Sequence, residues 1–442
     1  MKSKPLSETK SKKRSSKSLK SSKSSKSSKS FKNQNDAAPE SSTSRNLNVI
    51  ILVVFVMILI SVIVVMINNA FRKNEKNSGR AIQEKQVAEG KCFDPADIAK
   101  IPEETRLASA PKQNKRDCIF ISIASYRDSE CRDTVYDLFE LAEKPENIFV
   151  GVCQQNKEQE EDCFDRCPDC KKRKDSGHIR VKNFEHLDAK GPCFARYQCS
   201  LLYEGEEFYL QIDSHTKFIK HWDTKLIEQW RLCADENAVL STYPPTQSDL
   251  TKFEKQNFSN FSKLCNATWN SDGLPQFTAA IIKSPADQKP VPSGICSAGM
   301  LFFPGRALQK CPFDPYLNFL FFGEELLFSA RLWTNGFNFY TPIISVTGHH
   351  YTREGKPKFW TDLKNFESCR KKAITRVKYI LKMESSDTVD KEFLAEVDKY
   401  GLGSVRSIEE YWKYNKIDIE KAKKDKKLAL NLCKDDAYQR LV

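Results

Sequence analysis

The sequence predicts an α/β fold with a mostly parallel sheet, preceded by a single transmembrane helix. Three observations support this prediction. Short apolar runs of strand length alternate with segments of helical apolar spacing between residues 118 and 242, as in doubly wound α/β domains. Two of these runs end in polar turns. One apolar run near the N-terminus is far longer than any strand.

The alternation begins with the run CIFISI at residues 118–123, which ends in the polar turn Ser125-Tyr126-Arg127-Asp128. In an open parallel sheet, ligands bind outside the carboxyl ends of the strands. This turn falls at that edge, and so does the later tripeptide Asp213-Ser214-His215. The remaining predicted elements are, in order, helix 133–143, strand 147–153, strand 178–182, helix 191–203, strand 208–212, helix 222–233 and strand 238–242.

Asp213-Ser214-His215 follows the apolar run 208–212 and has the residue types of half a divalent-metal site. Residues i and i+2 of an extended strand point the same way, so we expect the carboxylate and the imidazole side by side. A hard oxygen ligand with a borderline imidazole suits Mn²⁺ or a similar first-row ion, which can hold a nucleotide diphosphate. The alternative is a turn aspartate followed by an incidental surface histidine.

The segment Phe321-Phe-Gly-Glu-Glu325 opens a predicted helix after a glycine, with two carboxylates in the first turn. Acidic residues also favour helix N-termini through the helix dipole alone. Adjacent helical residues point roughly 100° apart, so the two glutamates do not form a glycosidase pair flanking one bond. Glu324 and Glu325 are instead candidate catalytic residues, one of which holds a sugar or acceptor hydroxyl.

His349 and His350 follow a strand predicted at 343–347, and they are two of only six histidines in the chain. A distant histidine can complete the metal site begun by Asp213 and His215, leaving positions for diphosphate oxygens and water. A pair of surface histidines is the alternative.

The formal net charge of +13 is concentrated near the N-terminus. Residues 1–46 hold thirteen Lys or Arg against three acidic residues, so this segment carries +10. Much of it is a Lys-Ser-Ser repeat with almost no apolar side chain, which predicts a disordered tail. A nucleic-acid arm or nuclear signal is the alternative reading of such a basic run. We expect no nucleic-acid partner.

Residues 49–67, VIILVVFVMILISVIVVMI, carry no charge and are long enough to span a bilayer. A cleavable signal peptide has a shorter apolar core and a small-residue cleavage site. We therefore predict a retained signal anchor at 47–68, a cytoplasmic tail at 1–46 and a lumenal C-terminal region. A charged stem at 69–115 and a folded domain with a helical C-terminal extension at 116–442 complete a single-pass type II protein of the Golgi or ER membrane.

All fifteen cysteines lie beyond the apolar run, as expected for a region that folds in an oxidising lumen. Cys163-x3-Cys167-x2-Cys170 indicates local disulfides. The alternative is a zinc site completed by Cys153 or Cys193. Three glycosylation sequons begin at Asn257, Asn260 and Asn266 and suit a surface loop of a secretory glycoprotein.

Six ordered segments carry a resemblance to a known family. The region 116–420 resembles the polypeptide and hydroxyproline α-N-acetylglucosaminyltransferases, a retaining group with a GT-A-type nucleotide-sugar-binding fold. It is more distantly similar to the mucin-type polypeptide N-acetylgalactosaminyltransferases. The segments are ISIASYRD at 121–128, GPCFARY at 191–197, YLQIDSH at 209–215, STYPP at 241–245, FFGEE at 321–325 and KFW at 358–360.

The resemblance implies roles for the candidate residues. It implies that Asp213, His215 and a later histidine bind Mn²⁺ or a similar divalent cation. His349 is the predicted ligand, with His350 left open because His-x-x-x-Arg aligns on His349 and Arg353. It also implies that Glu324 or Glu325 contacts the transferred sugar. The residues implied to bind the UDP-sugar donor are Ser125, Tyr126, Arg127, Asp128, Arg196 and Asp213.

The implied reaction is metal-dependent transfer of N-acetylglucosamine from UDP-GlcNAc to a hydroxyl of a protein acceptor, with retention at the anomeric carbon. The acceptor residue is left open among serine, threonine and hydroxyproline. The alternatives are another UDP-sugar, a hydroxyproline acceptor in the cytoplasm, and an inactive carbohydrate-binding protein anchored to the membrane. A nucleic-acid tether at the membrane is a further alternative.

Overall fold

The computed structural model describes residues 42–88, 92, 115–167, 169–434, 438 and 441. The chain divides into two compact units, 1–74 and 75–442. Most of the predicted basic tail lies outside the described residues, and so do residues 89–91 and 93–114 of the predicted stem. The organisation predicted for these segments stays a prediction.

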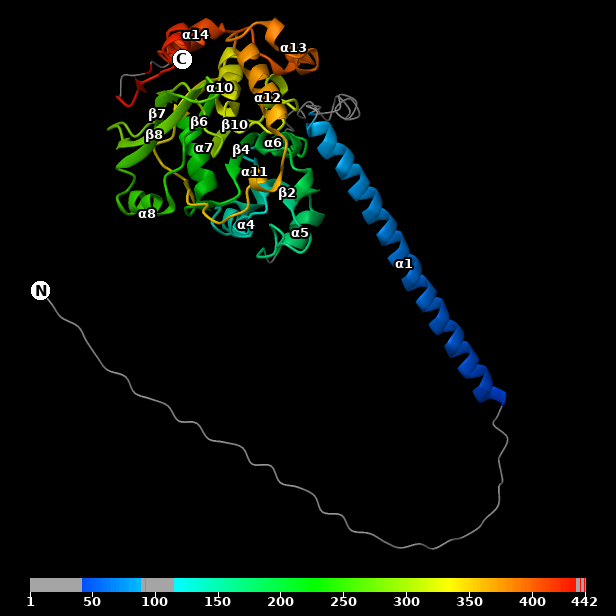
Figure 1. The fold of residues 1–442 in the computed structure, drawn as a ribbon. Coiled ribbons are helices and arrows are strands. Elements are labelled where there is room, and N and C mark those ends of the chain that lie inside the picture. Colours follow the sequence, from blue (N-terminus) through cyan, green and yellow to red (C-terminus); the bar gives the residue numbers. More distant parts are fainter. Residues whose placement is uncertain are drawn as a thin grey trace, which may run out of the picture. The chain divides into compact units, whose positions relative to one another are not determined.

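Helix α1 (Ser42–Ala88) contains the apolar run and extends beyond it into the region predicted as stem. Within its stretch Ile50–Ser78, an 18-residue window has a mean hydropathy of 3.6, and none of the side chains in that window is buried. Among the described residues it is the one helix long and apolar enough to cross a membrane. This finding rests on length and composition. The helix is drawn in blue in Figure 1.

The second unit is built around a mixed eight-stranded sheet in the order β3-β2-β1-β4-β10-β6-β11-β9. Four of its seven strand pairings are parallel, because β10 is antiparallel to both neighbours and β9 pairs antiparallel with β11. The predicted α/β fold with a mostly parallel sheet is therefore confirmed. The strands are β1 (Ile119–Tyr126), β2 (Ile148–Asn156), β3 (Ile179–Glu185), β4 (Phe208–Asp213), β6 (Ala238–Ser241), β9 (Val291–Ser293), β10 (Met300–Pro304) and β11 (Asn338–Thr341).

Two smaller sheets accompany it. Strand β5 (Thr216–Phe218) pairs with β12 (Thr347–His349), which brings a late segment of the chain beside the end of β4. The other small sheet has the order β13-β7-β8 and consists of β7 (Asn260–Trp269), β8 (Pro275–Lys283) and β13 (Leu430–Asn431).

Helices cover both faces of the large sheet (Figure 1). The helices are α4 (Cys131–Glu140), α5 (Cys170–Asp175), α6 (Pro192–Ser200), α7 (Trp222–Leu232), α8 (Gln247–Lys255), α9 (Ala307–Lys310), α10 (Glu324–Thr334), α11 (Phe359–Asp362), α12 (Glu367–Ile380), α13 (Val397–Tyr400), α14 (Ile408–Tyr414) and α15 (Ile419–Asp425). Short 3₁₀ turns lie at Pro145–Asn147, His186–Asp188, Ser386–Thr388 and Lys391–Leu394.

The central strands are apolar on both faces because both faces are covered. Ile121 and Leu210 pack with residues of α4 and α7 in one cluster. Their chain neighbours Phe120 and Tyr209 pack with residues of α6, α10 and α12 in another. This two-residue alternation places β1 and β4 in the middle of the domain, so their carboxyl ends have a rigid base.

The prediction of a strand at 343–347 is wrong. Strand β11 ends at Thr341, and the next strand, β12, begins only at Thr347. Pro342 lacks an N–H for a strand ladder. The amide nitrogens of Ile343 and Ile344 donate instead to the side-chain oxygen of Gln229, at 3.1 and 3.4 Å. The apolar run is therefore a buried loop held by a helix side chain.

Three disulfides occur among the described residues: Cys92–Cys369, Cys167–Cys170 and Cys265–Cys433. Cys167 and Cys170 thus form the local disulfide predicted for this motif. Cys163 is a buried free thiol whose Sγ lies 3.5 Å from Ser125 Oγ. Within the described part of the chain these cysteines do not form a zinc site.

A fully buried ion pair joins α12 to the loop before α10. Arg376 Nε donates to Asp314 Oδ2 at 2.9 Å, and both side chains have no exposed surface. Arg376 also donates to the carbonyl oxygens of Phe393 and Ala395, which attaches the C-terminal segment to the domain.

We predict that Asp314→Ala lowers the free energy of unfolding by about 3–5 kcal/mol, because it leaves a buried guanidinium without its counter-charge. Glu420→Ala, which breaks an exposed pair with Lys423, is the control, with an expected loss below about 0.5 kcal/mol. Chemical denaturation of the full chain in detergent measures both. Equal losses would contradict the structural role of the buried pair.

Candidate active site

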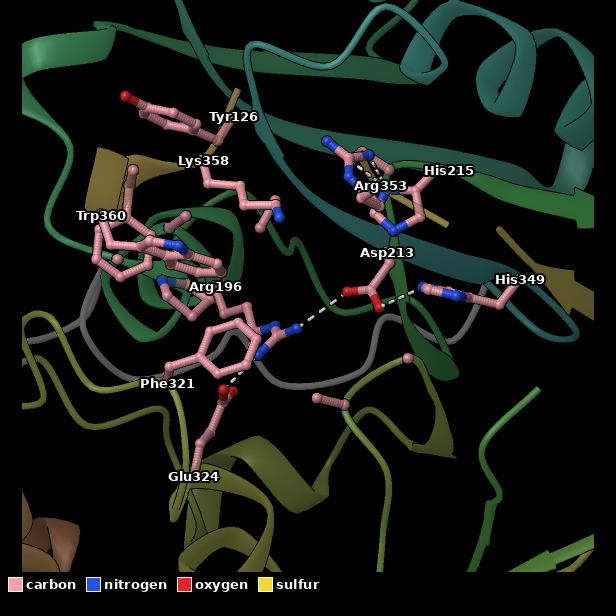
Figure 2. Close-up of a pocket in the computed structure, with 18 of the residues that line it drawn as sticks. Tyr126, Arg196, Asp213, His215, Phe321, Glu324, His349, Arg353, Lys358 and Trp360 are labelled. Carbon is pink, nitrogen blue, oxygen red and sulfur yellow. Dashed lines mark hydrogen bonds and ion pairs between the residues drawn. The ribbon is translucent and has the colours of Figure 1, made fainter. Parts of the chain in front are cut away.

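A cavity of about 480 Å³ opens at the carboxyl ends of β1 and β4. Its walls include the ends of β1 and β4, the first turn of α6, the start of α10, β12 and the segment 351–360. Figure 2 shows Asp213 near the centre of this cavity, between Arg196 on one side and His349 on the other. The location agrees with the rule that ligands of α/β sheets bind beyond the strand ends.

Asp213 is the last residue of β4, and His215 lies in the tight turn that leads into β5. The two side chains are therefore brought together by a turn, and not by strand alternation as the sequence suggested. Thr134 of α4 fixes this turn, because its hydroxyl donates to the carbonyl oxygen of Ser214 at 2.9 Å. The same hydroxyl oxygen accepts the Thr216 N–H at 3.0 Å.

His349 reaches the site through backbone pairing across more than a hundred residues. It lies opposite Thr216 in the β5–β12 ladder, and its N–H donates to Pro245 O at 2.9 Å. The neighbouring His350 points elsewhere, since its Nδ1 lies 2.8 Å from Glu130 Oε2. The structure thus brings His349, and not His350, to Asp213.

Asp213, His215 and His349 form a cluster that can hold a metal ion, because their ligand atoms all lie within 4.8 Å of one another. His349 Nε2 is 3.1 Å from Asp213 Oδ2. The two imidazole rings have centroids 4.5 Å apart and meet edge to face. One carboxylate and two imidazoles suit Mn²⁺ or a related first-row ion, so the residues present fit such a cation.

Asp128 contacts His215 of the metal cluster and orients its ring. Its Oδ2 lies 2.7 Å from His215 Nδ1 and accepts the hydroxyl of Ser214 at 2.6 Å and a guanidinium N–H of Arg353 at 2.5 Å. Burial opposes ionisation of this carboxyl, but hydrogen bonding from His215 and the charge of Arg353 hold its pKa well below its usual range. Arg353 Nη1 also lies 2.6 Å from the same Nδ1. Both contacts are on the Nδ1 side of the ring, which leaves His215 Nε2 for a cation.

Arg196 joins the metal cluster to the helix that carries the two glutamates. One of its N–H groups donates to Asp213 Oδ1 at 3.1 Å, and another donates to Glu324 Oε2. Burial disfavours the guanidinium charge, but the carboxylates of Glu324 and Asp213 outweigh it and raise the pKa of Arg196. Burial alone would raise the pKa of Asp213. The hydrogen bond with His349 and the charge of Arg196 outweigh burial, so the pKa is lowered.

Two glycines allow the helices of Arg196 and Glu324 to begin where they do. Gly191 precedes α6 at φ 85°, and a Cβ there would lie 3.0 Å from the Cα of Phe319. Gly323 precedes α10 at φ 105°. Both conformations are ones that side-chain-bearing residues rarely adopt.

Glu325 lies in the cavity wall, and its carboxyl group has hydrogen-bond partners other than Arg196. Its carboxyl group accepts the Tyr243 hydroxyl and the Ala298 N–H, the latter at 2.7 Å. Burial raises the pKa of Glu325 to about 7. These contacts hold the loop that contains Gly299, where a Cβ would lie 3.2 Å from Asp213 Oδ2. Glu325 therefore positions the backbone next to the metal cluster.

Of the predicted turn Ser125 to Asp128, Tyr126 lines the cavity. Ser125 and Asp128 are buried. Arg127 donates to Asp362 Oδ2 at 2.7 Å and to Glu160 Oε1 at 2.8 Å. Donor contact by all four residues stays a prediction, and the geometry favours Tyr126 among them.

Lys358 was not among the residues predicted for the site. It lines the cavity, and Figure 2 shows its ammonium end directed toward the side where His215 and Arg353 lie. Within the described part of the chain no carboxylate pairs with it, and its Nζ lies 5.9 Å from the centre of the Trp360 ring. The segment KFW at 358–360 carried part of the resemblance, but a lysine beside two aromatic residues does not by itself indicate a cationic site residue.

We predict that Asp128→Asn weakens Mn²⁺ binding by about tenfold or more, because the neutral amide orients His215 less firmly. Titration of the full chain with Mn²⁺ measures the dissociation constant without any turnover. Asp137→Asn, which alters a carboxylate paired with Lys217, is the matched control. Unchanged Mn²⁺ affinity in Asp128→Asn would show that Asp128 does not orient a metal ligand.

The raised pKa of Glu325 predicts that the folded state prefers the protonated form of this residue. The resulting contribution to stability is complete below the ordinary glutamate pKa of 4.5 and is lost as the pH rises through about 7. The midpoint temperature of thermal unfolding should therefore fall more steeply over this pH range in the wild type than in Glu325→Gln. Parallel pH profiles for the two proteins would rule out a raised pKa.

A family model described as "Glycosyltransferase (GlcNAc)" matches residues 118–172 and 165–421. A search of curated proteins finds no match. The fold is similar to a structure of GalNAc-T7 with UDP, GalNAc and Mn²⁺, at 13% identity and a TM-score of 0.42, covering 70% of this chain. The matched region spans 56% of the GalNAc-T7 chain.

Two further structures are similar. TarS 1–349 of S. aureus, in complex with UDP-GlcNAc, has 13% identity and a TM-score of 0.36, with 63% of this chain and 71% of that chain covered. The mannosyltransferase PcManGT of Pyrobaculum calidifontis, in complex with GDP-Man and Mn²⁺, has 12% identity and a TM-score of 0.34, with 72% and 90% covered.

These structural likenesses are distant. The family model, in contrast, extends over the whole region that builds the sheet and the cavity, including every residue of the metal cluster. The chain therefore belongs to the GlcNAc glycosyltransferase family.

Proposed function

We propose that this glycosyltransferase moves N-acetylglucosamine from UDP-GlcNAc to a hydroxyl of a protein acceptor, in a reaction that needs Mn²⁺ or a similar cation. One observation carries the proposal. Asp213, His215 and His349 converge within 4.8 Å in a cavity at the strand ends of a member of this family. The resemblance of the six sequence segments supports three further details: the GlcNAc donor, the protein acceptor and retention at the anomeric carbon.

Asp213, His215 and His349 would hold the cation. When bound, it would coordinate diphosphate oxygens and neutralise the negative charge that develops as UDP leaves. A cationic side chain of the protein supports the same charge. Lys358 directs an ammonium group without a carboxylate partner among the described residues into the cavity, and such a group binds phosphate oxygens well.

We propose that Glu324 binds the sugar that is transferred. Its carboxylate is held by Arg196, which also holds Asp213, so one guanidinium separates it from the metal cluster. A carboxylate with remaining lone pairs accepts hydrogen bonds from sugar hydroxyls. Tyr126 ends β1 and lines the cavity, which supports a proposed contact with the nucleoside. Glu325 acts on the reaction through the Ala298 backbone that it holds.

We further propose that α1 anchors the enzyme in a Golgi or ER membrane as a type II protein with the catalytic unit in the lumen. The apolar stretch of α1 and three disulfides beyond it support this topology. The partners of the enzyme are then the membrane, UDP-GlcNAc and a protein acceptor, with no nucleic acid among them.

A donor screen with the full chain in detergent tests the proposal. We expect release of UDP from UDP-GlcNAc in the presence of Mn²⁺, and much slower release from UDP-galactose, UDP-glucose and GDP-mannose. Asp213→Ala should lower the rate by a hundredfold or more, since it removes both a metal ligand and the partner of Arg196. A chelator should abolish the reaction in the wild type.

Asp425→Ala, which changes an exposed carboxylate on α15, is the matched control and should keep the wild-type rate. If Asp213→Ala turned over donor as fast as Asp425→Ala, the metal assignment would be wrong. If no nucleotide sugar were hydrolysed or transferred by the wild type, the protein would be a binding protein that has lost catalysis.

A further inference from the structure

Exposed aromatic side chains gather at one place on the catalytic unit. Eight large apolar side chains beyond α1 are exposed among the described residues, and four of the eight are aromatic. All four line the cavity of the active site, and none of the four aliphatic ones does. The aromatic four are Phe321, Phe322, Tyr351 and Trp360.

Three of these residues form a continuous surface, which we call the aromatic rim: Phe321, Phe322 and Trp360. Their exposed fractions are 46%, 45% and 43%. The Phe321 ring lies 5.2 Å from that of Trp360 and 5.0 Å from that of Phe322, both in edge-to-face contact. Figure 2 shows Phe321 and Trp360 on the Arg196 side of the cavity, across from His349.

The rim rests on a buried support, so its exposure does not reflect a loose loop. Phe359, beside Trp360, is 7% exposed and packs with Phe319 and Cys369 in a separate apolar cluster. Phe319 in turn stacks on Phe366 at 5.4 Å, and the Cys92–Cys369 disulfide lies in the same cluster. The rings are thus held in place while their outer faces meet water.

Half-exposed aromatic rings on a rigid base are typical of surfaces that a partner covers. The UDP part of the donor has other contacts available, since the diphosphate is assigned to the metal cluster and Lys358, and the nucleoside to Tyr126. Phe322 directly precedes Gly323 and Glu324. The rim therefore adjoins the end of the cavity where the sugar is transferred, at its opening to solvent.

We infer that the aromatic rim binds the acceptor polypeptide through apolar side chains that flank the hydroxyl to be glycosylated. The inference rests on the proposed function and adds to it a preference for apolar residues beside the acceptor residue of the polypeptide. The rim itself consists of apolar side chains, so flanking Asp, Lys or Gly residues gain little there, whereas Leu, Val, Pro or Phe side chains cover the rings and lose their own contact with water.

The test uses the full-length enzyme, UDP-GlcNAc, Mn²⁺ and short synthetic peptides with a single threonine or hydroxyproline. One set carries Leu, Val, Pro and Phe around the acceptor residue, and a matched set carries Asp, Lys, Gly and Gln. We expect kcat/KM for transfer to the apolar set to exceed that for the polar set by about tenfold or more, mainly through KM.

The double variant Phe321→Ala/Trp360→Ala should reduce this preference to less than about twofold, and Trp360→Phe should retain most of it, because a ring remains. Ile281→Ala, which truncates an exposed apolar side chain outside the cavity, is the control and should keep the full preference. Thermal unfolding midpoints of all variants show whether each is folded.

The outcomes separate this inference from the proposed function. UDP release without any peptide preference, or a preference that survives in the folded double variant, overturns the acceptor role of the rim and leaves the transferase intact. A weaker affinity of the double variant for UDP alone would assign the rim to the nucleoside instead, which also overturns the inference. Absence of both UDP release and transfer overturns the function, and the inference falls with it.

Discussion

The active site depends on the carboxylate of Asp213 and on the two side chains that contact it, a guanidinium group and an imidazole ring. Arg196 of α6 binds one of its oxygens and His349 of β12 lies against the other. Two further carboxylates, Glu324 and Asp128, lie nearby and are balanced by Arg196 and Arg353. A buried carboxylate without such partners would take up a proton or destabilise the fold. The charges therefore fix how α6, β4, β12 and α10 meet.

The backbone supports this arrangement from several directions. Thr134 fixes the turn after Asp213, Gly191 and Gly323 let α6 and α10 start at the cavity, and Glu325 holds the loop at Ala298. Such supporting contacts keep side chains in place before a ligand arrives, which is the main requirement for electrostatic catalysis. The chemistry proposed for the site follows from this fixed geometry, and the aromatic rim adds a specific surface at its opening.

Much of the fold and part of the site could be predicted from the sequence, because those features depend on local patterns. The strand before Asp213 and the helix after Gly323 have clear apolar spacing. Features that depend on distant pairing were harder to predict. The choice between His349 and His350 depends on the register of β12 against β5, and a shift of one residue would exchange them. The loop mistaken for a strand at 343–347 depends on Gln229 from a separate helix.

Other roles could not be seen in the sequence at all. The contact of Asp128 with the donor stays a prediction, but the contact of its carboxylate with His215 was not visible in the sequence. Phe321 and Trp360 are ordinary core residue types by composition, and only the structure shows their outer faces exposed at the cavity. Exposure of a side chain is a property of the packed fold, so a pattern of residue types along the chain does not reveal it.

The most direct test of the central claim is pulsed electron paramagnetic resonance of Mn²⁺ bound to the full chain, which detects couplings to directly bound imidazole nitrogens. We expect couplings from two histidines in the wild type and in His350→Ala, and from one in His349→Ala. A spectrum without histidine couplings, or one that changes in His350→Ala and not in His349→Ala, would contradict the convergence of Asp213, His215 and His349 on one cation.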